Sequence, residues 1–84
     1  MGFWGMLFNT SKLNSDPNQQ ELANLLIDAA SGKKKDYDVM NFLVKQPWSL
    51  SEGGNRIVHA LSMVKVRRPD LYPEAKRIGQ IFYR

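Results

Sequence analysis

The chain contains no cysteine among its 84 residues, so neither a disulfide nor a thiolate ligand or nucleophile is available. His59 is the single histidine, and the positions four residues away hold Asn55 and Met63 rather than a second zinc ligand. The patterns H-E-x-x-H, G-x-x-x-x-G-K-[ST] and G-x-G-x-x-G are also missing. These absences predict a protein that is not an enzyme and that holds neither a metal ion nor a cofactor.

Long apolar runs are absent as well. No stretch approaches the roughly 20 apolar residues that span a bilayer. The apolar residues at the start of the chain have no basic residues before them and no small-residue cleavage site after them, unlike a secretory signal. We therefore expect a cytoplasmic protein. An apolar content of 43% and a charged content of 24% are typical of a folded chain, and the length allows one compact domain over residues 1–84.

Acidic residues are scarce toward the C-terminus, and this makes the charge uneven. Residues 55–84 hold seven basic and two acidic side chains, whereas residues 1–54 hold five basic and six acidic ones. The two parts carry net charges of +5 and −1, which give +4 for the chain. A positive C-terminal third favours a negatively charged partner such as nucleic acid, anionic lipid or an acidic protein.

The spacing of apolar residues predicts an all-α fold, a compact domain of about four short helices in an orthogonal or bundle-like array, with no sheet. Asp16 and Pro17 suit the start of a helix over residues 17–31, and Gly32 suits its end. A second helix is expected over residues 36–46, before Pro47. Its apolar residues cover most of its circumference, which predicts that it lies at the centre of the domain.

Two further helices are expected over residues 55–68 and 73–83. Ser49 and Glu52 have the spacing of a capping box, which would begin the third helix earlier. However, Gly53 and Gly54 inside a helix would cost about 2 kcal/mol relative to alanines, which favours a start at Asn55 and a turn or short helical piece before it. The alternative is that the glycines permit another backbone to approach closely. The residues expected to face the core are Leu50, Ile57, Val58, Leu61 and Val64 in the third helix and Ala75, Ile78, Ile81 and Phe82 in the fourth.

Basic residues on these two helices form a candidate nucleic-acid-binding surface. They are Arg56, Lys65, Arg67, Arg68, Lys76, Arg77 and Arg84. Helical spacing places them away from the apolar stripes. If the basic sides of the two helices point the same way, they form one patch that pairs with phosphates, with Tyr83 or His59 stacking on bases or forming hydrogen bonds. The favoured hypothesis is a non-enzymatic regulatory or accessory module that engages nucleic acid or a nucleic-acid-associated complex. The competing interpretation is an ordinary solvated surface.

The N-terminal arm, residues 1–15, is the second unusual segment. Five large apolar residues fall within positions 3–8, and the candidate partner contacts among them are Phe3, Trp4, Leu7 and Phe8. The arm either fills a groove between the helices or is exposed as an anchor. Exposure suggests a protein–protein adaptor or inhibitor that docks through this arm or through Trp48, or a peripheral membrane-associated protein. None of these hypotheses determines an oligomeric state.

Overall fold

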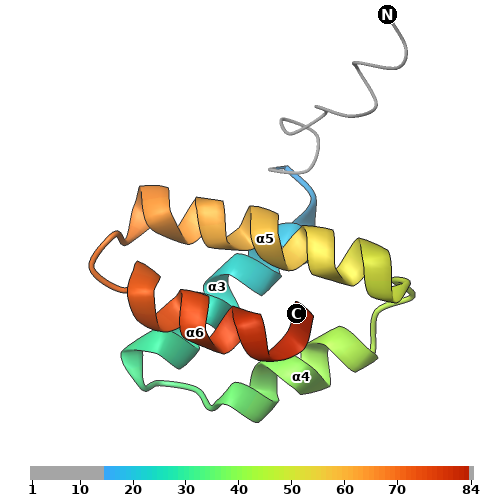
Figure 1. Ribbon diagram of the computed structural model, residues 1–84, viewed down its shortest axis with the longest axis horizontal. Coiled ribbons are helices and arrows are strands. Elements are labelled where there is room, and N and C mark those ends of the chain that lie inside the picture. Colours follow the sequence, from blue (N-terminus) through green and yellow to red (C-terminus); the bar gives the residue numbers. More distant parts are fainter. Residues whose placement is uncertain (1–14, 84) are drawn as a thin grey trace, which may run out of the picture.

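The computed structural model describes residues 15–83, apart from the side chain of Tyr83. It contains four helices, α3 (Pro17–Ser31), α4 (Asp36–Val44), α5 (Leu50–Arg67) and α6 (Tyr72–Tyr83), and no strand within the described residues. The predicted all-α single compact domain is confirmed. Helices α5 and α6 form an antiparallel pair, and α3 passes behind them at a steep angle (Figure 1). The proposed contacts Phe3, Trp4, Leu7 and Phe8 lie outside the described residues, as does Arg84.

Local capping sets both ends of α3. The carboxylate of Asp16 accepts hydrogen bonds from the backbone N–H groups of Asn18 at 2.8 Å and Gln19 at 3.4 Å. Pro17 occupies the first turn, where its missing N–H leaves no donor unsatisfied. At the other end, Gly32 adopts the left-handed conformation with φ 91°, which glycine tolerates without strain. The predicted helix over residues 17–31 is confirmed at both ends.

The centre of the domain is α3, so the prediction that the helix over residues 36–46 lies there is wrong. Helix α3 packs against α4, α5 and α6, whereas α4 packs chiefly against α3. Leu22 and Leu26 of α3 are fully buried. The short α4 buries only Val39 completely and leaves Tyr37 57% and Met40 47% exposed. Its apolar circumference therefore marks an exposed surface and not a central position.

Helix α5 begins at Leu50 and continues through both glycines, so the predicted start at Asn55 is wrong. The hydroxyl of Ser49 accepts a hydrogen bond from the backbone N–H of Glu52 at 3.0 Å, which caps the first turn. The carboxylate of Glu52 pairs with Arg56 one turn later, at 3.1 Å. Capping and this pair act together with the burial of the following turns, and they offset the helix-propensity cost of two glycines.

The apolar stripes of α5 and α6 are narrower than predicted. Helix α5 buries Ile57, Leu61 and Val64, and α6 buries Ala75 and Ile78, with Phe82 partly buried against them. Three residues expected to face the core are instead exposed: Leu50, Val58 and Ile81. The reason is that α5 packs mainly against α3 and α6, so within the described residues these three side chains lie outside the main helix contacts.

Two glycines in these helices differ in their surroundings, and opposite effects on stability are expected. A Cβ atom at Gly53 would meet no atom within 4 Å, whereas one at Gly79 would lie 3.1 Å from both Ile57 and Leu61. Gly53→Ala should raise the free energy of unfolding by about 1 kcal/mol, because alanine favours the helix. Gly79→Val should lower it by about 1–3 kcal/mol, because α6 must move away from α5. Urea unfolding followed by circular dichroism measures both, and equal shifts would contradict this packing.

Candidate functional site

Three helix ends enclose an apolar groove at one end of the domain. The C-terminal ends of α4 and α6 meet the N-terminal end of α5 there (Figure 1). The groove has a volume of about 340 Å³. Its apolar walls are formed by Leu43, Val44, Trp48, Leu50, Ile57 and Phe82, and the backbone of Gly53 and Gly54 lines it between them. This volume lies within the range of pockets that accept part of a ligand or a few side chains of a protein partner.

Large apolar side chains at this groove are exposed to solvent. Leu50 is 96% exposed and Val44 is 72% exposed. Single exposed apolar residues are ordinary on a protein surface, but these two border the same hollow. Grouped apolar exposure of this kind is typical of an interaction site.

The aromatic wall of the groove is held in place by two ring contacts. Trp48 and Phe42 pack edge to face, with ring centroids 6.0 Å apart and an angle of 69° between the ring planes. The guanidinium group of Arg56 lies over the Trp48 ring, with its carbon 4.3 Å from the ring centroid. Such cation–π contacts stabilise by about 0.5–2 kcal/mol and orient the indole.

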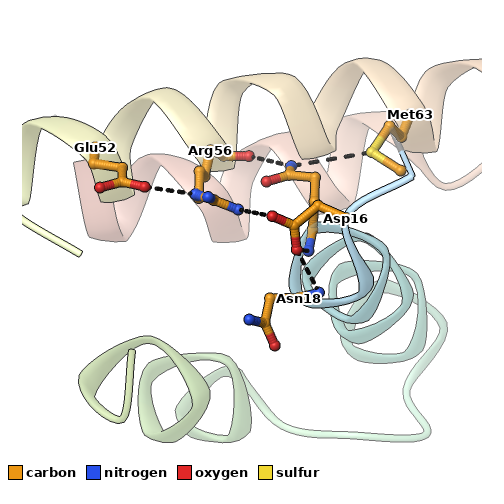
Figure 2. A network of polar contacts seen from close by, with 6 residues as sticks. Asp16, Asn18, Glu52, Arg56 and Met63 are labelled. Atoms are coloured by element: carbon orange, nitrogen blue, oxygen red, sulfur yellow. Dashed lines mark hydrogen bonds and ion pairs between the residues drawn. The ribbon is translucent and has the colours of Figure 1, made fainter. Parts of the chain in front are cut away.

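Arg56 also connects the groove to the first turn of α3. Figure 2 shows its guanidinium between Glu52 and Asp16, where Nη1 lies 3.3 Å from the Asp16 carboxylate. The buried Gln19 donates from Nε2 to the backbone carbonyl of Arg56 at 2.8 Å. Burial would raise the pKa of Asp16, but hydrogen bonds from Asn18, Arg56 and Gln19 lower that pKa below its usual 3.8. Arg56 is therefore a structural link, with 15% of its side chain exposed.

Acidic neighbours hold two more of the predicted phosphate contacts. Arg68 pairs with Asp70 at 2.9 Å, and Arg77 pairs with Glu74 at 2.6 Å and lies 3.9 Å from Asp36. The hydrogen bond from Arg68 lowers the pKa of Asp70, and the one from Arg77 lowers the pKa of Glu74. These carboxylates offset the positive charge that the two arginines bring to the surface.

The remaining predicted basic residues lie on separate seams between helices. Arg67 of α5 donates to the side-chain oxygen of Asn24 on α3 at 2.7 Å. Lys65 faces α6 instead, with its ammonium 5.3 Å from the centroid of the Tyr72 ring. Lys76 is exposed one helical turn after Tyr72. Since Arg77 approaches the start of α4, the predicted basic surface is divided among the α3/α5, α5/α6 and α6/α4 seams.

The titrating side chains predict a two-stage loss of stability in acid. Burial lowers the pKa of His59 below 6.5. As the pH falls through about 6.5, the unfolded chain therefore binds a proton before the folded chain does, and the free energy of unfolding decreases. Asp16, Asp70 and Glu74 have lowered pKa values, so the stability that they provide is present above their unfolded values and is lost as the pH falls through the folded ones. Urea unfolding from about pH 3 to pH 8 measures both stages. His59→Gln should remove the upper stage alone, and an unchanged upper stage would contradict the assignment.

The part of the chain that the structure describes shows neither a metal site nor a membrane-spanning helix. No group of three or more His, Cys, Asp or Glu residues within it is arranged to hold a metal ion. None of its helices combines the length and the apolar character that crossing a membrane requires.

Sequence reasoning did not identify the groove, although two signals pointed toward it. One was the glycine pair directly after a capping signal, where glycine has no conformational role. The other was the apolar circumference of α4, which supplies Leu43 and Val44 to the groove. Comparisons with protein-family models, curated proteins and solved structures found no match to this chain.

Proposed function

We propose that this protein is a non-enzymatic binding module that holds an apolar segment of a protein partner in the groove between α4, α5 and α6. The observation that carries this proposal is the exposure of Leu50 beside Val44 at the edge of one apolar hollow. It retains the adaptor or inhibitor hypothesis from the sequence, and it moves the main contact from residues 3–8 to the groove.

The physical basis is the removal of apolar surface from water. Complete burial of a leucine or valine side chain contributes about 1.5–3 kcal/mol, so covering Leu50 and Val44 together contributes about 3–6 kcal/mol toward binding. A micromolar complex needs about 8 kcal/mol after the costs of association, so the other groove residues must contribute as well. Trp48 adds a half-buried aromatic wall whose orientation is held by Phe42 and Arg56. Oriented tryptophans surrounded by apolar residues are frequent binding hot spots.

Nucleic-acid binding is the second candidate function. It is favoured by the net charge of +4 and by the α5/α6 seam, where Lys65 and Lys76 lie on the same side as the Tyr72 ring. Neither lysine forms an ion pair with an acidic residue in the described region, unlike Arg68 and Arg77. Two lysines and one ring offer fewer phosphate contacts than the seven residues expected from the sequence.

A peptide selection tests the groove directly. A phage-displayed library of random 16-residue peptides is selected on the whole protein, and the enriched peptides are measured by fluorescence anisotropy. We expect apolar-rich peptides whose affinity falls about tenfold or more in Leu50→Ala, since this exposed side chain contributes to binding and not to folding. The matched control is Val66→Ala, because Val66 is an exposed valine of the same helix outside the groove.

The same assay separates the two candidate functions. Labelled duplex DNA and RNA are titrated at several salt concentrations, and a salt-dependent affinity that Lys65→Glu reduces would support the second candidate. Peptide binding that Leu50→Ala leaves unchanged would exclude the groove as the site.

A further inference from the structure

Within the described part of the chain, neither glycine at the groove is required by its backbone conformation, and Gly53 is not required by close packing either. Gly32 is the only glycine there with a positive φ, so neither Gly53 nor Gly54 is needed for an unusual backbone conformation. At Gly79 the close approach of Ile57 and Leu61 accounts for the missing side chain, but the space above Gly53 is open. Glycine inside a helix lowers stability. What the pair does provide is a stretch of α5 backbone without side chains, directly on the groove.

The side-chain charge beside the groove is positive. Its walls contain no acidic residue, and Glu52, next to Gly53, is paired with Arg56. Lys45, between the groove residues Val44 and Gln46, is exposed and forms no ion pair with any acid of the described residues. The helix ends at the groove contribute both signs, since the N-terminal end of α5 meets the C-terminal ends of α4 and α6.

From these observations we propose that the groove binds one amphipathic helix of a protein partner, with its backbone crossing α5 at Gly53 and Gly54 and with acidic residues beside Lys45. Small residues allow two helices to approach closely, so side chains from both sides of the crossing contact each other. The partner's apolar residues would cover Val44, Leu50 and Trp48. This inference rests on the proposed function and specifies the shape and charge of the partner segment.

Charge also distinguishes this partner from a second copy of the same chain. A symmetric contact through the groove places the same surface on both sides of the interface. The groove lining that the second copy brings contains no acidic residue, so Lys45 would gain no ion-pair partner from it. An acidic helix offers such a partner, which is why the proposal specifies a different chain.

The test uses two labelled model helices of 16 residues with leucines at i, i+3, i+4 and i+7. One carries glutamates at the flanking positions and the other carries lysines there. Fluorescence anisotropy with the full-length protein should show micromolar affinity for the acidic helix and at least about tenfold weaker affinity for the basic one. Lys45→Glu should reverse this preference.

The decisive variant is Gly53→Ala, because folding and binding should respond in opposite directions. A methyl group in open space raises the thermal midpoint, but it blocks the approach of a partner backbone, so the acidic helix should bind about tenfold more weakly. Val66→Ala, outside the groove, should leave the affinity unchanged, although alanine in place of the exposed valine also favours the helix and should raise the thermal midpoint slightly. A loss of binding without a loss of stability excludes unfolding as the cause.

The possible results separate this inference from the proposed function. Unchanged affinity in Gly53→Ala, or equal affinity for the two helices, would overturn the helix crossing while Leu50→Ala still tests the groove itself. Phe3→Ser with Trp4→Ser would overturn it too if the acidic helix then bound tenfold more tightly, since the chain's own arm would then be the occupant. Sedimentation equilibrium that shows a dimer dependent on Leu50 would assign the groove to a second copy and overturn it as well.

Discussion

Replacing Leu26 by alanine is expected to lower the free energy of unfolding by about 3 kcal/mol. Leu26 is fully buried in α3, the helix that contacts all three others, so neighbouring side chains cannot collapse into the space without moving a helix. The loss combines the transfer of the side chain from the core with the cavity that remains. A domain of this size has a stability of about 5–10 kcal/mol, so a large part of it would disappear.

Urea unfolding followed by circular dichroism measures this effect. The control is Leu50→Ala, the same change at a leucine that is 96% exposed. It should alter the free energy of unfolding by less than about 0.5 kcal/mol. Equal destabilisation by the two variants would show that Leu50 packs against the fold and would contradict both the central position of α3 and the exposed groove.

Replacing Arg56 by methionine is expected to lower the free energy of unfolding by about 1–3 kcal/mol. Methionine retains the apolar stem but removes the ion pairs with Asp16 and Glu52 and the contact with the Trp48 ring. The two carboxylates then lose their shared partner beside the α3/α5 contact. Because Trp48 also loses its orienting cation, peptide binding in the groove should weaken in the same variant.

A double-mutant cycle with Asp16→Asn isolates the long-range ion pair from the other contacts of Arg56. The coupling between Arg56 and Asp16 should be favourable, because most of the Arg56 side chain is removed from solvent. Arg68→Met is the control, since Arg68 and Asp70 are both exposed and the loss of their pair should lower the free energy of unfolding by less than about 1 kcal/mol. A zero coupling for Arg56 with Asp16 would contradict its role as the link between α3 and the groove.

The candidate site could be predicted from the sequence only where partners are close along the chain. Arg77 follows Glu74 by three residues in α6, so that pair was available from helical spacing. Arg68 and Asp70 are two residues apart in the connection between α5 and α6, where helical spacing does not apply. The contact of Arg56 with Asp16 spans 40 residues, and that of Arg67 with Asn24 spans 43. Those partners depend on how α3 crosses α5. The expectation that seven basic residues share one surface therefore needed geometry that the sequence does not contain.

By itself, the sequence determined the helical class and the bounds of α3, because capping and apolar spacing act within a few residues. Only the tertiary structure decided which helix lies at the centre and which apolar residues stay exposed. Burial depends on neighbours that are distant in the chain: α4 is apolar around most of its circumference, yet α3 covers only one side of it. For the same reason the groove at Leu50 and Gly53 exists only where three helix ends meet.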